Sequence, residues 1–465
     1  IIITPIPGKV SDEKLIDEDQ RLTHLDSLLY GKFLRSTVLR KSRRDLKFSV
    51  LPLMFLPDSQ ENTAIEETEN ECATSLETLK DLIAENQGSY LKDHEWDELI
   101  ALLEGTKAIS KPHARHVEED YRDSWAAIIK ENEDRIATFD RDQRRAAITV
   151  VNGPQRIRGI AGSGKTIVLA MKAAYLHLSN PESSILITFW TKSLYDIIKI
   201  QITRFYRQFS DSDPDWEKVK VLHAWGGKNQ EGVYFNACVA SNVRALSLNQ
   251  IPNSERSKFG YACRQLRDTR LVRSQYDYVL IDEGQDLPSE FYQLCFDLCI
   301  GGETDRNIIW AYDELQTIMD AQAQDVEKTF GFTPDGTPRI DLIRAQREIS
   351  KGSITHDIVL KMSYRNPPEI LVLAHAIGMG IYGKNIVQML ENQSHWEDLG
   401  YTLIEGDCKE GQHTVIRRPP ENSPLNISEY LSLNEIVKHS SQESFAKELE
   451  WVFGGIEECL QQGLK

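Results

Sequence analysis

Short apolar runs alternate with helical stretches from about residue 129 onward. Runs rich in β-branched side chains predict strands at 156–160, 184–190, 220–225, 278–282 and 307–312. Strands of this length, separated by helical stretches, are typical of a parallel sheet that is covered on both faces. We therefore predict a doubly wound α/β domain, whose ligands bind at the carboxyl ends of the strands.

The N-terminal part of the chain follows a different pattern. A helical periodicity over 17–47 carries basic residues in its second half, and an apolar run at 48–57 predicts a buried strand. The polar stretch at 107–124 is typical of a linker. We expect residues 1–128 to form an α/β accessory domain.

Two other segments depart from the regular alternation of strands and helices. Residues 227–275 interrupt it with polar helical stretches, which predicts an inserted subdomain. After residue 346 a second α/β-like region begins, and it runs to an amphipathic helix that starts at Ser444. These changes of pattern predict a second domain in the last quarter of the chain.

The charge and cysteine content narrow the class of protein. The 465 residues carry 54 Lys and Arg against 71 Asp and Glu, a net charge of −17, whereas a non-specific nucleic-acid coat protein is basic. A local basic groove remains compatible with this total, because field focusing depends on where charges lie. The chain contains no run of eighteen uncharged apolar residues, so we expect no membrane span.

The seven cysteines include no C-x-x-C pair, so they predict neither a disulfide framework nor a zinc site. We expect a cytoplasmic, reducing location.

A glycine-rich loop follows the first predicted strand of the sheet. Residues 159–166, GIAGSGKT, fit the pattern G-x-x-x-x-G-K-[ST] without exception. In such a loop the backbone N–H groups of residues such as Gly162, Ser163 and Gly164 surround phosphate oxygens. Lys165 is expected to reach the β- and γ-phosphates, and the Thr166 hydroxyl to coordinate Mg²⁺. The loop predicts that the protein binds a nucleoside triphosphate.

Two adjacent carboxylates complete this prediction. The apolar run at 278–282 ends in Asp282 and Glu283, which a parallel sheet would place beside the phosphate loop. Asp282 can hold Mg²⁺, and Glu283 can polarise the attacking water. An adjacent glutamate favours hydrolysis over phosphoryl transfer to a second substrate.

The stretch 282–286, DEGQD, has the form D-E-x-Q-D and resembles the superfamily 1 helicases of the UvrD/Rep type. The resemblance extends over 139–367 and implies a P-loop NTPase with RecA-like domains. It implies that Gln143 reads adenine and that Gln316 senses the γ-phosphate. It further implies that Tyr364 stacks on adenine and that Arg365 contacts the γ-phosphate from the second domain.

The same resemblance implies a nucleic-acid track and a domain plan. Phe189 and Lys192 in ITFWTKS, and His223 and Trp225 in LHAWG, match single-strand contact segments. The implied substrates are ATP with Mg²⁺ and single-stranded DNA in preference to RNA, with 3′→5′ movement and a place in DNA repair or phage defence. The implied domains are a first RecA-like domain at 129–345, with its insertion at 227–275, and part of a second at 346–465.

The chain departs from the family pattern at several positions. Ile318 and Met319 replace an expected aromatic–arginine platform, so Trp190, Trp225 or Trp310 would have to stack on bases instead. The family's last two motifs are not found, which predicts an incomplete second domain or a second polypeptide, such as a partner nuclease. Residues 1–128 are compatible with a nuclease-related remnant, but residues 1–60 show no D…E-x-K pair, which favours a scaffold or partner-docking role.

Three functions remain open at this stage. The first is an ATP-dependent DNA helicase or translocase. The second is an ATP-operated switch that controls a protein partner without unwinding, which the missing motifs and the acidic charge favour. A small-molecule kinase explains the phosphate loop but leaves Gln143, Gln316 and Arg365 without a role, so we give it the least weight.

Overall fold

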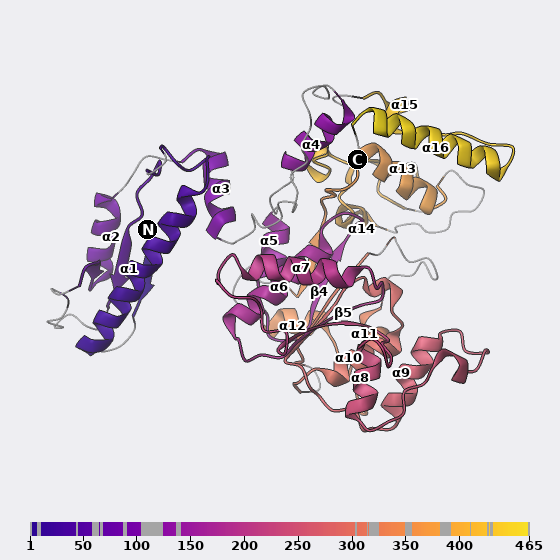
Figure 1. The fold of residues 1–465 in the computed structure, drawn as a ribbon, viewed down its shortest axis with the longest axis horizontal. Helices are drawn as coiled ribbons and strands as arrows, with labels where there is room; N and C mark the ends of the chain where they lie inside the picture. The colour runs from indigo at the N-terminus through magenta and orange to yellow at the C-terminus, as the bar shows by residue number, and fades with distance from the viewer. Residues whose placement is uncertain are drawn as a thin grey trace. The chain divides into compact units, whose positions relative to one another are not determined.

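The computed structural model (Figure 1) describes most of the chain and divides it into two compact units, Ile1–Thr106 and Lys107–Lys465. The described residues are 2–6, 11–42, 45–57, 65, 68–86, 91–103, 124–135, 141–302, 305–313, 315, 325–348, 356–381, 392–409, 411–425, 427 and 431–463, with the side chains of 131–135, 141 and 347–348 excepted. Among these residues, no helix has the length and apolarity that a membrane crossing requires.

The first unit is built on a small parallel sheet. Its strands are β1 (Ile2–Pro5), β2 (Pro52–Phe55) and β3 (Glu71–Ala73), in the order β1-β2-β3. Its helices are α1 (Asp12–Leu34), α2 (Leu76–Glu85) and α3 (Asp93–Leu103). Leu15 and Leu22 of α1 pack against Met54 and Leu56, so the strand predicted at 48–57 is confirmed as buried.

Helix α1 ends earlier than the sequence predicted. It stops at Leu34, and the described residues 35–42 and 45–47 that follow are not helical. The Ser36 hydroxyl donates to the buried carboxylate of Glu98 on α3, and it also accepts from the backbone N–H of Val38 at 3.3 Å. A serine that bonds locally and across to another helix competes with helical hydrogen bonds, which explains the stop.

A six-stranded parallel sheet forms the centre of the second unit. Its order is β6-β5-β7-β8-β4-β9. The strands are β4 (Gln155–Gly159), β5 (Ile185–Phe189), β6 (Val219–His223), β7 (Tyr278–Ile281), β8 (Ile308–Tyr312) and β9 (Asp357–Leu360). Each of the five predicted runs contains or overlaps one of these strands. The sixth, β9, was not predicted; it pairs with β4 from Arg156↔Asp357 to Gly159↔Leu360.

Helices cover both faces of this sheet, as the doubly wound prediction requires. They are α5 (Arg141–Ile148), α6 (Lys165–Ser179), α7 (Leu194–Tyr206), α8 (Val233–Ala240), α9 (Lys258–Asp268), α10 (Ser289–Leu298), α11 (Val326–Phe330) and α12 (Leu342–Glu348). Along β8, Ile308 and Trp310 join the core cluster of α8, α9 and α10, whereas Ile309 joins that of α6 and α7. Alternate side chains therefore enter two different cores.

The segment 227–275 holds α8, α9 and the 3₁₀ turn Leu248–Gln250. Its buried side chains, such as Tyr234 and Phe259, belong to the same core cluster as α10. The helices of this segment therefore cover one face of the sheet, and its status as a separate subdomain remains a prediction.

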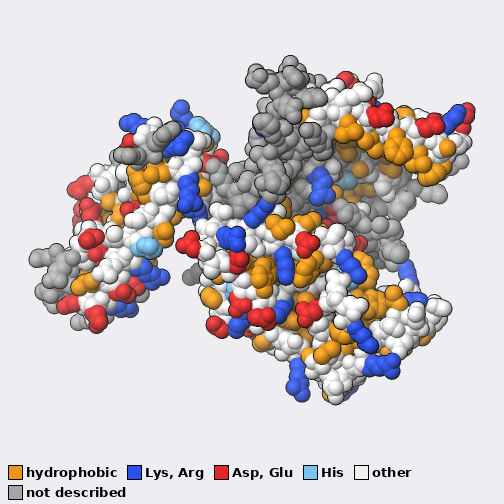
Figure 2. All heavy atoms as spheres, viewed as in Figure 1, with side chains coloured by type: hydrophobic (Ala, Val, Ile, Leu, Met, Phe, Trp, Pro, Cys, Tyr) orange, Lys and Arg blue, Asp and Glu red, His pale blue; other side chains and the backbone are white. Residues whose placement is uncertain are grey.

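The second unit has further elements, some of which contribute to a smaller core. They are α4 (Trp125–Arg135), α13 (Pro368–Gly378), α14 (Gln393–Asp398), β10 (Thr402–Glu405), β11 (Val415–Arg417), α15 (Leu433–Ile436) and α16 (Phe445–Gln461), with β10 and β11 antiparallel. Leu371, Trp396 and Tyr401 are central to this core. Helix α16 is capped by Ser444, as predicted, but buries none of its residues, and Figure 2 shows apolar side chains along it. The proposed boundary between 129–345 and 346–465 remains a prediction.

Candidate nucleotide site

The phosphate loop connects the end of β4 to the first turn of α6. Gly162 and Gly164 adopt left-handed backbone conformations, with φ of 80° and 84°. A Cβ at Gly162 would lie 2.6 Å from the Cβ of Arg365, and one at Gly164 would lie 2.6 Å from Nε2 of Gln143. Both positions therefore require glycine for two reasons, the backbone conformation and the close approach of a neighbour.

Lys165 is buried beneath the loop that it follows. Its side chain is 6% exposed, and Nζ donates to the carbonyl oxygens of Gly159 at 2.9 Å and Ile160 at 3.2 Å. It also forms an ion pair of 3.5 Å with Asp313, which follows β8. Two neighbouring strands thus place a cation and its counter-ion at one edge of the sheet.

Asp282 follows β7 at the same edge. Its side chain is fully buried, and neither carboxylate oxygen has a hydrogen-bond partner among the described residues. Burial and the charge of Glu283 raise the pKa of Asp282 to about 6, while the Thr166 hydroxyl and Lys165 act in the opposite direction. Buried carboxylates are normally satisfied, so an unpaired one beside a hydroxyl is what a divalent cation with oxygen ligands needs.

Glu283 has a strained backbone, with φ of 48° and ψ of 46°. Its Oε2 accepts a hydrogen bond of 2.6 Å from Nε2 of Gln285, which lies in the 3₁₀ turn Gly284–Asp286. Oε1 of Gln285 in turn accepts from the backbone N–H of Asp313 at 3.1 Å. A continuous network thus joins Glu283 through Gln285 and Asp313 to Lys165.

Gln143 lies on α5 and approaches the loop from the other side. It is 4% exposed, and Nε2 donates to the carbonyl oxygen of Ser163 at 2.7 Å. Its amide therefore holds the loop backbone in this conformation. The predicted reading of adenine by Gln143 remains a prediction.

Tyr364 and Arg365 also reach the loop, although they lie about 200 residues further along the chain. The backbone N–H of Tyr364 donates to the carbonyl oxygen of Gly162 at 2.9 Å. Arg365 is exposed and packs its Cβ next to Gly162. Gln316, Ile318 and Met319 lie outside the described residues.

The four predicted nucleic-acid contacts differ in accessibility. Phe189 is fully buried, so it cannot touch a bound strand in this conformation; it ends a strand whose two faces are both covered. His223 is 8% exposed, and its Nδ1 accepts from the backbone N–H of Trp225 at 3.1 Å. Lys192 is exposed, and Trp225 is half-buried.

Aromatic side chains pack together around Trp225. Its ring stacks on Phe259 at 4.8 Å, and Trp190 lies 5.1 Å from Phe259 and 5.6 Å from His223, measured between ring centroids. Trp310, at 1% exposure, is a core residue. Of the three tryptophans considered for base stacking, Trp190 and Trp225 retain some exposed surface.

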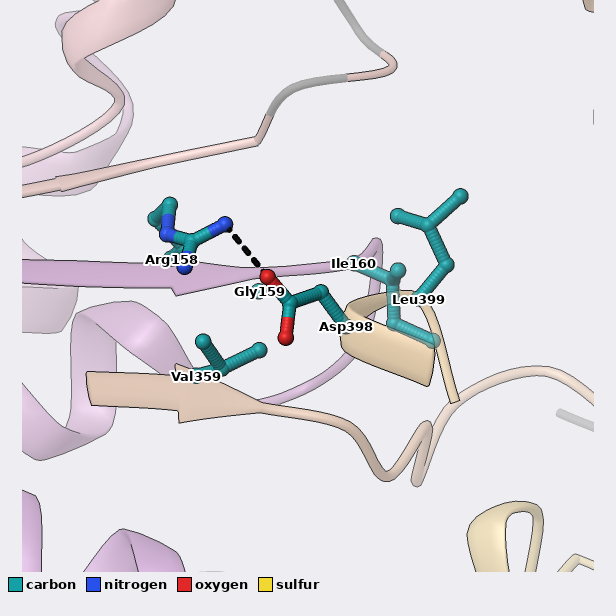
Figure 3. A pocket seen from close by; sticks show the side chains of 6 residues that line it. All are labelled: Arg158, Gly159, Ile160, Val359, Asp398 and Leu399. Atoms are coloured by element: carbon teal, nitrogen blue, oxygen red, sulfur yellow. Dashed lines mark hydrogen bonds and ion pairs between the residues drawn. The ribbon is translucent and has the colours of Figure 1, made fainter. Parts of the chain in front are cut away.

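Sequence reasoning missed the ion pairs that lie directly before the loop. Arg156 and Arg158 on β4 both bind the carboxylate of Asp357 on β9, and Arg158 also binds Asp398 of α14 at 2.8 Å. Arg158 and Asp398 line a small cavity with Gly159, Ile160, Val359 and Leu399 (Figure 3). Burial alone raises the pKa of Asp357, but the two arginines lower it below its ordinary value. The alternation R-x-R at the end of a strand was the available signal.

Three or more His, Cys, Asp or Glu side chains do not come together as a metal-binding group anywhere in the described part of the chain. Thr166 and Asp282 therefore offer one hydroxyl and one carboxylate that can coordinate a divalent cation. Sites with one or two protein ligands plus phosphate oxygens are ordinary for Mg²⁺.

No protein-family model matches this chain, and no curated protein matches it either. Among solved structures, the UvsW helicase from bacteriophage T4 aligns with 51% of this chain and 69% of its own, at 13% sequence identity and a TM-score of 0.23. A likeness of this size identifies no family. The functional conclusion therefore depends on the geometry of the loop, the buried aspartate and their neighbours.

Proposed function

We propose that this protein hydrolyses ATP at the loop 159–166 and uses the energy as a helicase-type motor. The unpaired, fully buried carboxylate of Asp282 beside Thr166 carries the proposal. Leaving a buried charge without a partner costs stability, so its presence needs a functional reason. A metal-bound triphosphate supplies that reason.

Each residue of the site has a distinct task in this proposal. The loop amides bind phosphate oxygens, and Lys165 exchanges its contacts with the Gly159 and Ile160 carbonyls for the β- and γ-phosphates. Glu283 orients the attacking water and accepts its proton, with Oε2 positioned by Gln285. Arg365, next to Gly162, neutralises charge that develops on the γ-phosphate.

Mg²⁺ would be held by Thr166 and Asp282, and when bound it would neutralise charge on the phosphate oxygens. Asp282 serves this purpose in its ionised form. The neighbouring Lys165 and Thr166 favour that form against the effect of burial.

We further propose that the motor is of the UvrD/Rep type, with single-stranded DNA as its track in preference to RNA and with 3′→5′ movement. The motif order through SYRNP supports this proposal, as does the exposed Lys192 at the carboxyl edge of the sheet. DNA repair or phage defence, with a partner nuclease, is the corresponding biological setting.

A second candidate is an ATP-operated switch that acts on a protein partner. The burial of Phe189 favours it, because one expected contact with a nucleic-acid strand is absent from the surface. The packing of Trp225 against Phe259 favours it for the same reason.

Steady-state ATP hydrolysis with and without single-stranded DNA, duplex DNA and RNA tests both candidates. The Lys165→Ala variant is the blank. We expect single-stranded DNA to raise turnover at least tenfold, which would establish the motor and its track. Turnover that none of the three polymers changes would contradict the motor and favour the switch. Absence of hydrolysis above the blank under every condition would contradict both.

A further inference from the structure

The phosphate loop is held from outside by Ser363, a residue to which the sequence analysis gave no role. Ser363 is fully buried, and its Oγ donates to the carbonyl oxygen of Ala161 at 3.0 Å. The next residue, Tyr364, donates its backbone N–H to Gly162. Two consecutive loop carbonyls are therefore bonded to two consecutive residues that follow β9.

These bonds fix the direction of a loop amide. In a trans peptide the C=O of one residue and the N–H of the next point in opposite directions. When Ser363 holds the carbonyl of Ala161, the N–H of Gly162 is turned to the opposite side. The Ser363 hydroxyl thus selects one of the orientations that this glycine-containing peptide can adopt.

The start of the loop is held by the same part of the chain. Arg158 is the residue before Gly159, and its terminal nitrogen donates a hydrogen bond of 2.8 Å to the carboxylate of Asp398 (Figure 3). Arg158 and Arg156 also both bind the carboxylate of Asp357. Both ends of the stretch 158–162 are consequently anchored to residues beyond 356, one by charge and one by hydrogen bonds.

Ser363 is itself fixed by a buried cation. Its backbone N–H donates to the carbonyl oxygen of Asn422 at 3.0 Å, and the same oxygen accepts a hydrogen bond of 2.6 Å from the guanidinium of Arg418. Arg418 is 6% exposed and also binds the carbonyl oxygens of Leu399 and Lys361, at 2.6 Å and 3.0 Å. A guanidinium with this many bonds leaves Ser363 little freedom to move.

We propose that Ser363 and Asp398 form a clamp that positions the phosphate loop, with Ser363 as the positioning residue at its tip. The clamp rests on the proposed function and adds that nucleotide affinity depends on two residues with indirect roles: Ser363 binds the loop backbone, and Asp398 binds Arg158 just before the loop. The backbone bond from Tyr364 to Gly162 is separate from the Ser363 hydroxyl, and it keeps Arg365 beside the loop when that hydroxyl is removed. Binding of nucleotide is thereby coupled to the position of the region that holds Arg418.

Equilibrium binding of Mg²⁺-ADP to the whole chain tests the clamp. Ser363→Ala removes the hydroxyl and leaves the buried Ala161 carbonyl without its donor, so we expect the dissociation constant to rise about tenfold. Asp398→Asn keeps its shape and leaves Arg158 paired to Asp357, so we expect a rise of about threefold. Ser183→Ala is the matched control, since Ser183 is 5% exposed at the far end of α6 and should not change the constant.

Kinetics separate positioning from general damage. We expect Ser363→Ala to raise KM for ATP while kcat stays within twofold, and Arg365→Ala to lower kcat with little change in affinity. A dissociation constant for Ser363→Ala within twofold of the unaltered chain would overturn the clamp and leave the proposed function standing. If Ser363→Ala fails to fold, an unchanged constant for Asp398→Asn would overturn it instead. Failure of the unaltered chain to bind Mg²⁺-ADP or ATP would overturn the proposed function itself.

Discussion

Two neighbouring parts of the same sheet edge differ in how their side chains are satisfied. At the carboxyl ends of β4 and β7, the buried carboxylate of Asp282 has no hydrogen-bond partner among the described residues, and two loop glycines have positive φ. At the carboxyl ends of β5 and β6, aromatic rings fill the space, and Trp225 stacks on Phe259. In the first region the Asp282 carboxylate is available to a ligand, whereas in the second region the aromatic rings already pack against one another.

This difference shows which sequence motifs have the physical properties of a binding site. The sequence predicted the nucleotide region from the spacing of the loop residues, whereas it predicted the strand contacts only through a resemblance to a family. A region built to bind an ion keeps polar groups unsatisfied and a backbone that admits close approach. By that criterion the region around Asp282 has the properties of a binding site, whereas the rings around Trp225 belong mainly to the core.

The largest effect is expected at Lys165. Lys165→Ala removes the cation that pairs with Asp313 and that the loop holds for the phosphates, so hydrolysis should fall more than 100-fold, with loss of nucleotide binding. Lys172→Met is the matched control, because Lys172 is a buried lysine on the same helix with its Nζ on the carbonyl of Thr149. Equal losses in the two variants would mean that the helix, and not the loop cation, had been damaged.

Replacement of the water-activating group should give the next largest effect. Glu283→Gln retains a partner for Gln285 but cannot accept a proton, so turnover should fall about 100-fold while nucleotide affinity stays within twofold. Single-turnover hydrolysis and equilibrium binding measure the two quantities separately. A normal turnover in this variant would show that another residue activates the water.

The aromatic region should respond in stability and not in nucleotide binding. Trp225→Ala removes the ring between Phe259 and Tyr234, and we expect the free energy of unfolding to fall by about 3 kcal/mol, with unchanged affinity for nucleotide. Urea unfolding measures this loss, and Trp451→Ala on the exposed face of α16 is the control with little expected change. An unaltered stability combined with lost stimulation by single-stranded DNA would make Trp225 a contact residue and break the comparison.

The smallest effect concerns the second lysine of α6. Burial lowers the pKa of Lys172 to about 7, whereas an unfolded chain would give about 10.5. Between these values the unfolded state binds more protons, so this group makes the free energy of unfolding rise with pH. From pH 7 to pH 9 the unaltered chain should gain up to about 2.5 kcal/mol relative to Lys172→Met. Parallel pH dependence in both chains would show that Lys172 is charged inside the fold.

The fold of the main sheet was accessible from sequence because its signals are local. Every residue of the strands within the apolar runs 184–190 and 307–312 is buried. A strand that is buried on both faces consists mainly of apolar residues, and this composition can be recognised in the sequence. The strand β9 was missed because it is short and begins with the charged residue Asp357. The carboxylate of Asp357 pairs with two arginines some 200 residues away, and this pairing is not visible in the local sequence. The end of α1 was missed for a similar reason, since Glu98 holds Ser36 from another helix.

The sequence predicted some residues of the candidate site and missed others. The loop glycines, Lys165 and Asp282 follow spacing rules that reflect phosphate and metal geometry directly. The burial of Phe189 depends on packing from both faces of the sheet, and no spacing rule contains that information. Ser363 was not singled out because a lone serine gains its role only when the chain returns to the loop.

The left-handed backbone of Glu283 has a consequence for engineering this protein. A glutamate held at φ of 48° keeps a strained conformation, which costs roughly 1–2 kcal/mol. Asparagine tolerates that region better, so Glu283→Asn should relieve part of the strain while it removes the carboxylate that we propose as the water-activating group. We therefore expect Glu283→Asn to raise the free energy of unfolding and to abolish hydrolysis.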